Sequence, residues 1–128
     1  MSHLLPPPRA GHSAILYHDQ MIVFGGKDED NNKLNDIWAF DFPTSKWSEI
    51  QLSETNYIKP TIRSGHSACL YNDIMIVFGG IHEVTKELND LCAFDFKQNK
   101  WVQFFEEMNS PAKRGSSANS SRKKDDSP

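Results

Sequence analysis

The 128-residue sequence has little cysteine, no long apolar run and no excess of positive charge, and each shortage excludes a class of protein. Its two cysteines, Cys69 and Cys92, form no spaced set of the kind that builds a disulfide framework or a zinc site. No stretch approaches the roughly 20 apolar residues that span a bilayer. The formal net charge of −3 argues against a nucleic-acid-binding surface, which would be basic. Because the N-terminus also lacks a signal-peptide pattern, the sequence predicts a soluble, cytoplasmic protein that binds neither membrane nor nucleic acid.

Long helical periodicity is absent as well, whereas short apolar stretches between turn residues are frequent. These stretches are rich in β-branched and aromatic residues and are bounded by Asp, Asn, Gly and Pro, which favours strands. We expect strands at 13–17, 21–24, 37–42 and 47–52, and again at 67–71, 74–78, 91–96 and 101–105. The sequence therefore predicts an all-β fold made of two four-stranded antiparallel units.

The same pattern occurs twice, at a constant offset of 54 positions. RAGHSA at 9–14 returns as RSGHSA at 63–68, and MIVFGG at 21–26 returns unchanged at 75–80. LND at 34–36 returns at 88–90, and FDF at 40–42 returns at 94–96. An offset kept without insertion or deletion indicates two copies of one structural unit. A residue present in both copies then belongs to the scaffold more readily than to a unique catalytic centre.

The repeated polar, glycine and tryptophan positions are interpreted as structural. We expect the arginines to tie neighbouring loops, the aspartates to bond backbone groups at the start of the third strand, and the tryptophans to pack between sheets. Each of the two repeated histidines, His12 and His66, is followed by serine. Nucleophilic catalysis needs further groups, so we expect these histidines only to form hydrogen bonds at the start of the first strand. The glycine pairs are expected to end the second strand. The positions are Arg9, Gly11, His12, Gly25, Gly26, Asp36 and Trp47, with their counterparts Arg63, Gly65, His66, Gly79, Gly80, Asp90 and Trp101.

The second strand of each copy is a continuous apolar run. Residues 21–24 (MIVF) have no polar face, which is typical of a strand covered on both sides. Small sheets stacked face to face around an axis form a β-propeller. The two copies are therefore interpreted as two propeller blades.

These motifs together resemble the kelch repeat. The resemblance rests on Arg-x-Gly-His-Ser, the apolar strand with its Gly-Gly pair, the strand that begins Asn-Asp, and the spaced tryptophan, and it covers residues 6 to about 105. It implies one propeller blade per copy with the Gly-His-Ser strand innermost. It also implies protein–protein binding, with cytoskeletal, ubiquitin-ligase and small-GTPase pathways as open alternatives.

The expected organisation is an N-terminal extension at 1–8, the first repeat at 9–52, a connection at 53–62 and the second repeat at 63–105. Residues 106–118 read as the degenerate start of a third repeat, and 119–128 as a disordered tail. Propellers typically contain about 4–8 blades, and two blades leave two apolar faces uncovered. We therefore expect either a segment of a larger propeller or several copies that assemble into a ring.

The longer connections differ between the copies and are expected to lie on one rim, since an up-and-down strand order alternates the edges at which loops emerge. They are residues 27–33, 53–62 and 81–87. An acidic loop here could attract a basic partner segment or be merely solvated, and Tyr57 could contact a partner or pack beneath its loop. The candidate partner-binding residues are Asp28, Glu29, Asp30, Tyr57, His82, Glu83 and Lys86.

The sequence thus predicts a non-catalytic protein-interaction module that needs no cofactor or metal. A segment that functions only with further blades, or as an oligomer, is the first alternative. The second is an enzyme similar to galactose oxidase, a kelch-fold copper protein. That chemistry needs converging His, Tyr and Cys ligands, and the five histidines here show no ligand spacing.

Overall fold

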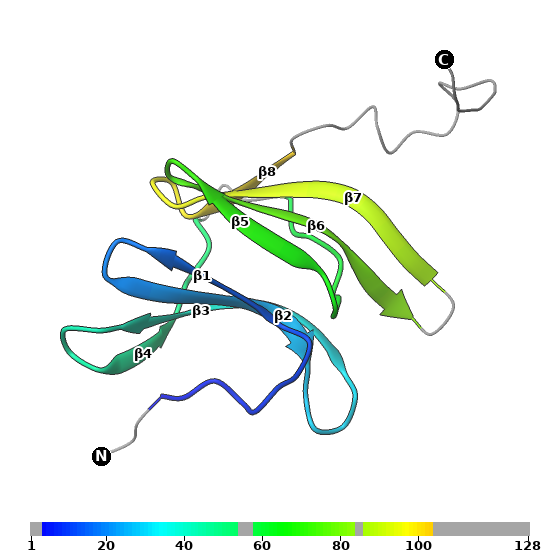
Figure 1. The fold of residues 1–128 in the computed structure, drawn as a ribbon, viewed down its shortest axis with the longest axis horizontal. Coiled ribbons are helices and arrows are strands. Elements are labelled where there is room, and N and C mark those ends of the chain that lie inside the picture. Colours follow the sequence, from blue (N-terminus) through cyan, green and yellow to red (C-terminus); the bar gives the residue numbers. More distant parts are fainter. Residues whose placement is uncertain (1–3, 54–57, 84–85, 104–128) are drawn as a thin grey trace.

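A computed structural model describes residues 4–53, 58–83 and 86–103, and this part of the chain forms two four-stranded sheets (Figure 1). The first sheet contains β1 (Ser13–Tyr17), β2 (Gln20–Lys27), β3 (Lys33–Asp41) and β4 (Lys46–Glu49). The second contains β5 (Ser67–Tyr71), β6 (Ile74–Glu83), β7 (Lys86–Asp95) and β8 (Lys100–Gln103). Both sheets are antiparallel and follow the order of the sequence, which confirms the all-β prediction. The expected third-repeat start and the tail lie outside the described residues.

Short turns join the strands because their residues suit the required backbone. His18 and Asn72 take positive φ values of 53° and 54° in the turns that follow β1 and β5. Asn adopts this left-handed conformation more readily than most residues, and His is also enriched there. After β3, the Asp41 carboxylate accepts hydrogen bonds from the Thr44 backbone N–H and hydroxyl group. These local bonds fix the hairpins on one edge of each sheet.

The second strand does not end at its glycine pair, so that prediction is wrong. β2 continues through Gly25 and Gly26 to Lys27, and its pairing with β3 shifts register between Phe24 and Gly26. Both glycines have positive φ, at 71° and 98°. Glycine accommodates this backbone without strain, so the pair forms a bulge that bends the strand instead of ending it. β6 repeats the feature, and both third strands consequently begin earlier than expected.

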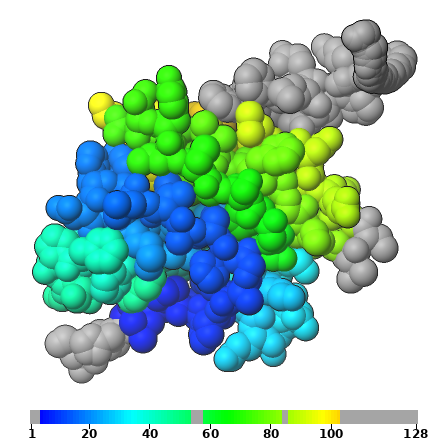
Figure 2. All heavy atoms as spheres, in the orientation of Figure 1, coloured from blue at the N-terminus to red at the C-terminus, as the bar shows by residue number. Residues whose placement is uncertain are grey.

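The two sheets pack face to face. Phe24 of β2 and Trp101 of β8 meet with ring centroids 5.0 Å apart, and Tyr17 stacks on Phe96 at 4.1 Å. β1 lies against β5, and the halves of the chain meet along a broad front (Figure 2). The core between the sheets comprises Ile22, Phe24, Ile37, Ala39, Met75, Val77, Phe94 and Trp101.

Each sheet is covered by the other on one face only. Trp101 is buried between the sheets as expected, at 2% exposure. Trp47 is not, because it packs on Phe40 on the opposite face of the first sheet, where the described part of the chain places no further sheet. On the outer face of the second sheet, Phe78 is 49% exposed. The expectation that the second strands are covered on both sides is therefore wrong for β6, whereas residues 22–26 of β2 are all buried.

Candidate functional site

Backbone pairing gathers the longer connections at one edge of the two sheets. The Ala10 N–H donates to the Lys27 carbonyl, the Arg63 N–H to the Leu34 carbonyl and the Ser64 N–H to the Ile81 carbonyl, each at 3.0 Å. The segment that precedes each sheet is thereby held to the ends of β2, β3 and β6. We call this region the loop edge and define it as residues 27–33, 58–62, 81–83 and 86–87. It includes residues of all three connections that the sequence singled out.

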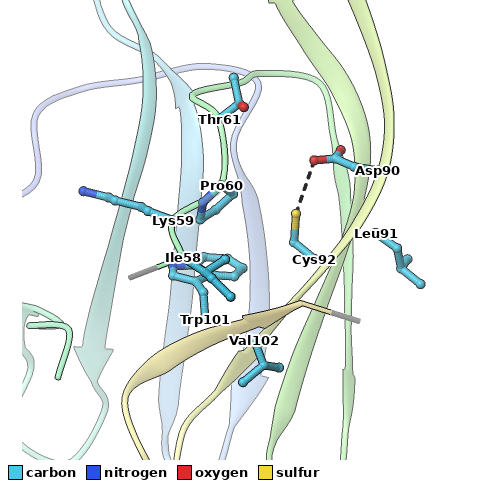
Figure 3. A pocket seen from close by; sticks show the side chains of 9 residues that line it. All are labelled: Ile58, Lys59, Pro60, Thr61, Asp90, Leu91, Cys92, Trp101 and Val102. Carbon is cyan, nitrogen blue, oxygen red and sulfur yellow. Dashed lines mark hydrogen bonds between the residues drawn. The ribbon is translucent and has the colours of Figure 1, made fainter. Parts of the chain in front are cut away.

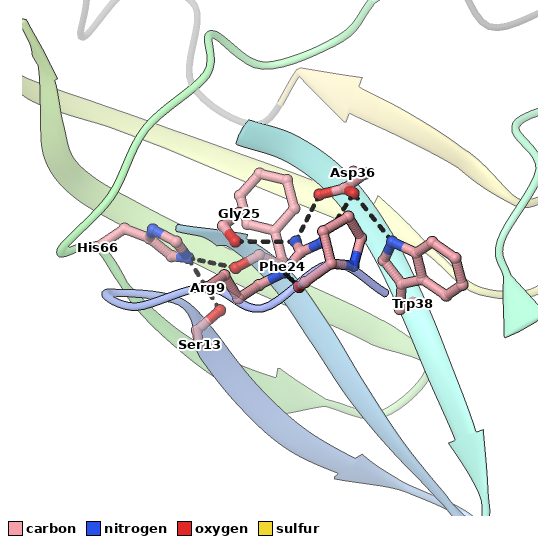
Figure 4. Close-up of polar contacts among 8 residues, drawn as sticks. Arg9, Ser13, Phe24, Gly25, Asp36, Trp38 and His66 are labelled. Carbon is pink, nitrogen blue, oxygen red and sulfur yellow. Dashed lines mark hydrogen bonds and ion pairs between the residues drawn. The ribbon is translucent and has the colours of Figure 1, made fainter. Parts of the chain in front are cut away.

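An arginine–aspartate pair secures the loop edge in each sheet. Arg63 is fully buried and donates two hydrogen bonds to the Asp90 carboxylate, at 2.7 and 2.8 Å, and one to the Gly79 carbonyl at 3.0 Å. Arg9 repeats this with Asp36 at 2.7 and 3.1 Å and with the Gly25 carbonyl at 3.1 Å (Figure 4). The arginines were expected to tie neighbouring loops, and each does use several donors, but the main partners lie in strands β2, β3, β6 and β7.

The aspartates have different main partners from those expected. Arg63 holds the pKa of Asp90 below its ordinary value, against the opposing effect of burial. Burial acts to raise the pKa of Asp36, but hydrogen bonds from Arg9 and Trp38 outweigh it, so this pKa is also lowered. Both carboxylates are therefore ionised and paired at neutral pH. They form a structural clamp, and the recurrence of one Arg and one Asp in each copy was the sequence signal for it.

His66 links the sheets. Its Nε2 lies 2.9 Å from the Ser13 hydroxyl and 3.1 Å from the Phe24 carbonyl, both in the first sheet (Figure 4). Burial lowers the pKa of His66 to about 4, so the ring is neutral at pH 7. The hydrogen bonds expected of this histidine are present, although they cross between sheets. His12 is exposed, and no hydrogen bond holds its ring within the described residues.

The first connection is a compact acidic loop. The Asp28 carboxylate accepts hydrogen bonds from the backbone N–H groups of Asp30 and Asn32, both at 2.9 Å. The bond from Asn32 is the largest of several that lower the pKa of Asp28. Glu29 and Asp30 are exposed. Asp28 therefore shapes the loop, while Glu29 and Asp30 present carboxylates to solvent.

The corresponding connection in the second sheet is shorter than expected. His82 and Glu83 belong to β6 and Lys86 to β7, so the interpretation of all three as loop residues is wrong. The strands extend because Glu83 pairs in register with Lys86 beyond the bulge. The His82 Nδ1 lies 3.1 Å from the Ile62 carbonyl, which ties the connection between the sheets to β6. Tyr57 lies outside the described residues.

A small pocket lies beside the same connection, between residues 58–61 and the strands β7 and β8 (Figure 3). Its volume is about 150 Å³, below the roughly 300–1,000 Å³ of typical ligand pockets. Cys92 lines it and donates to Asp90, and burial raises the pKa of this thiol to about 11. The thiol is therefore protonated at neutral pH, which is the unreactive form.

The described part of the chain lacks a metal-binding cluster and a membrane-spanning helix. No three His, Cys, Asp or Glu side chains in the described part of the chain are grouped so as to hold a metal ion. Likewise, residues 4–53, 58–83 and 86–103 contain no helix long and apolar enough to cross a membrane.

Comparison with known proteins agrees with the stacked four-stranded sheets. Residues 1–125 match the KLHDC2/KLHL20/DRC7 Kelch-repeats domain. The chain belongs to the kelch-repeat family. Its first sheet, β1–β4, is therefore kelch blade one, and its second sheet, β5–β8, is kelch blade two.

Several curated proteins share this kelch sequence. Kelch domain-containing protein 3 of Rattus norvegicus is 35% identical over 100 residues, which cover 77% of this chain and 25% of the relative. Rho GTPase-activating protein gacHH of Dictyostelium discoideum is 37% identical over 80% of this chain and 7% of its own length. Ras guanine nucleotide exchange factor F of the same organism is 39% identical over 74% of this chain and 8% of its own length. The kelch chain thus spans a quarter or less of these relatives, and the family relation supports a protein-interaction module as its general class.

Proposed function

We propose that this chain is a non-catalytic protein-interaction module that binds a partner through its loop edge. The observation that carries the proposal is the combination of a repeated, clamped scaffold with a non-repeated edge. The Arg9–Asp36 and Arg63–Asp90 pairs are nearly identical, whereas the connections they support differ in length, charge and strand content. Rigid scaffolds that carry variable connections are where recognition residues tend to lie.

The charge of the edge suggests the chemistry of the partner. Glu29 and Asp30 present two exposed carboxylates on a loop whose shape Asp28 fixes. A loop held in this way loses little conformational entropy on binding. A basic segment of the partner would be steered to it, mainly through a faster association rate.

The non-catalytic part of the proposal rests on four side chains that already have structural partners. Asp36 and Asp90 are paired with arginine, His66 bonds across the blades, and the Cys92 thiol is held protonated. Each therefore already has a structural partner, and none combines the free nucleophile and the adjacent base that nucleophilic catalysis uses.

Among partner classes, small-GTPase signalling has specific support. Two relatives that share this kelch segment are named as a Rho GTPase-activating protein and a Ras guanine nucleotide exchange factor. We propose that a component of such a pathway is the first partner to test. Purified Rho- and Ras-type GTPases, loaded in turn with GDP and a non-hydrolysable GTP analogue, are suitable probes.

The loop edge is tested with charge reversals that spare the fold. Glu29→Lys/Asp30→Lys changes only exposed side chains, and Glu49→Lys in β4 is a matched control outside the loop edge. Partners captured by the wild-type chain are purified and titrated against each variant by calorimetry or interferometry. We expect the double variant to weaken binding by about tenfold or more and the control to leave it unchanged. Equal affinity for all three proteins would remove the loop edge as the binding surface.

A further inference from the structure

The two open faces of the molecule carry the same side chains as the two faces already in contact. The buried contact joins one face of blade one, formed by Ile22, Phe24, Ile37 and Ala39, to one face of blade two, formed by Met75, Val77, Phe94 and Trp101. Adding 54 to the residues of the blade-one face gives Ile76, Phe78, Leu91 and Ala93, which lie on the open face of blade two. Subtracting 54 from the residues of the blade-two face gives Met21, Val23, Phe40 and Trp47, which lie on the open face of blade one. Every counterpart is identical except Leu91, which replaces Ile37. The two open faces of one chain therefore carry the residue types found on the two sides of the contact between its blades.

Two residues that are buried between the blades have exposed counterparts on the open faces. Phe24 is 0% exposed beneath His66 and Trp101, whereas Phe78 is 49% exposed. His66 is buried against blade one, whereas His12 is exposed. Phe78 and His12 are thus exposed where their counterparts Phe24 and His66 are buried, although Val23 and Ala93 are buried on the open faces as well.

The polar groups of the contact are also present on the open faces. His66 reaches the Ser13 hydroxyl and the Phe24 carbonyl, and the counterparts are His12, Ser67 and the Phe78 carbonyl. Tyr17 donates to Asp73 at 2.9 Å, and the counterparts are Tyr71 and Asp19. The weak ion pair of Lys97 with Asp73 is not repeated, because Pro43 stands at the Lys97 counterpart.

The bulge glycines show the space that an incoming histidine would occupy. A Cβ built on Gly25 would lie 2.7 Å from His66 Cε1, so the ring packs directly against this glycine. Gly79 has almost the same φ, 72° against 71°, but a Cβ there would meet only the Leu88 carbonyl, at 3.3 Å. Among the residues that the structure describes, none occupies the position beside Gly79 that corresponds to the His66 ring.

Blade one is already arranged to receive a neighbour. Arg9 Nε donates to the Pro7 carbonyl as Arg63 Nε donates to the Thr61 carbonyl, at 3.2 and 3.0 Å. The N-terminal segment therefore approaches blade one by the course that residues 61–63 take into blade two. It borders an open hollow of about 400 Å³ that His12, Ala14 and Trp47 also line.

We propose that a second copy of this chain binds head to tail, with the open face of its blade one on the open face of blade two. The His12 ring of the incoming copy lies beside Gly79 and bonds Ser67 and the Phe78 carbonyl. A head-to-tail contact repeats until the rotation closes, and since propellers contain about 4–8 blades, closure takes about two to four copies. The occupant is a second copy because the recurring offset makes this chain complementary to itself.

The first test uses one substitution on each open face of the full chain. Phe78→Arg changes blade two, Ala14→Arg changes blade one, and Gln98→Arg, in an exposed turn, is the control. Sedimentation velocity is measured from about 1 to about 100 μM, where micromolar contacts assemble. We expect wild type and Gln98→Arg to form a closed oligomer, and each face variant to weaken association on the order of 30-fold.

Mixing the variants identifies the geometry. In an equimolar mixture of Phe78→Arg and Ala14→Arg, one intact pair of faces remains, so we expect a dimer with one copy of each that grows no further. Failure of this dimer to form, with wild type still assembling, would overturn the head-to-tail contact. A wild-type chain that stays monomeric throughout, or an assembly that survives both substitutions, would overturn the proposal and leave the faces to other blades.

A native thiol provides a second readout that needs no substitution. Cys69 is exposed on the open face of blade two, at the counterpart of Ile15, which packs against the core. We expect its reaction with Ellman's reagent to slow at least about tenfold as the wild-type chain assembles, and to slow in Phe78→Arg only at about 30-fold higher concentration. A labelling rate independent of concentration would contradict assembly through this face.

Discussion

At the scale of single residues, the molecule depends on a few polar side chains buried among apolar ones. Arg63 is fully buried, and its guanidinium is satisfied by a carboxylate and two carbonyl groups. The sequence indicated that Arg63 and Asp90 were structural because both recur, but not that they were partners, since 27 residues separate them. That pairing depends on how the segment before β5 crosses β6 and β7, which local sequence does not specify.

Removal of the buried arginine is expected to be strongly destabilising. Arg63→Ala leaves Asp90 without its ionic partner and should lower the free energy of unfolding by about 3–5 kcal/mol. Arg63→Lys keeps the charge but loses the paired hydrogen bonds, so an intermediate loss is expected. Urea unfolding measures both. Lys97→Ala, which removes an exposed contact of 3.6 Å with Asp73, is the control and should cost less than about 1 kcal/mol.

The buried His66 is expected to make stability depend on pH. Its pKa is about 4 in the folded chain, below its ordinary value of 6.5. Between these values the unfolded chain binds a proton that the folded chain does not, so the free energy of unfolding falls as pH is lowered, by up to about 3 kcal/mol. In dilute, monomeric protein, His66→Gln should reduce this slope, whereas His12→Gln, at the exposed counterpart, should retain it. Equal slopes in both variants would show that the His66 ring is not buried as described.

At the scale of structural elements, the sequence predicts strand cores better than strand ends. The first strands at 13–17 and 67–71 are predicted correctly, because two-residue turns limit them. The second strands are predicted too short, since a Gly-Gly pair ends many strands but here forms a bulge. His82, Glu83 and Lys86 were assigned to a loop for the same reason. The bulge depends on Arg63 and His66 packing against it, which is tertiary information.

Alanine substitutions at the two bulges compare the free space beside Gly25 and Gly79, because the backbone geometry is the same at both positions. Gly25 and Gly79 have φ values of 71° and 72°, so alanine introduces the same local strain at both positions. At Gly25 the methyl group would also collide with His66 and the Arg63 carbonyl. We expect Gly25→Ala to cost about 2 kcal/mol more than Gly79→Ala in dilute, monomeric protein. Equal thermal unfolding of the two variants would contradict the packing of His66 on β2.

At the scale of the whole molecule, identical sequences occupy unequal environments. The repeat predicted two structural units, and the apolar second strand predicted that their sheets stack as blades, but neither could show which copy of a repeated residue is buried. Phe24 and Phe78 have the same neighbours in sequence, yet only Phe24 lies between blades. Trp47 was expected between blades by analogy with Trp101, and was wrongly placed for this reason. Burial in this chain is decided by which faces meet, a property of the assembly of blades.

The face-to-face packing of blades one and two is the central claim, and nuclear Overhauser contacts between aromatic protons test it most directly. The Phe24–Trp101 pair spans the blades at 5.0 Å, and the Phe40–Trp47 pair lies within blade one at 5.1 Å, so the second pair is an internal standard for the first. We predict cross-peaks of similar strength for both pairs, together with a Tyr17–Phe96 cross-peak from rings stacked at 4.1 Å. A spectrum with the Phe40–Trp47 contact but without the two contacts across the blades would contradict the account.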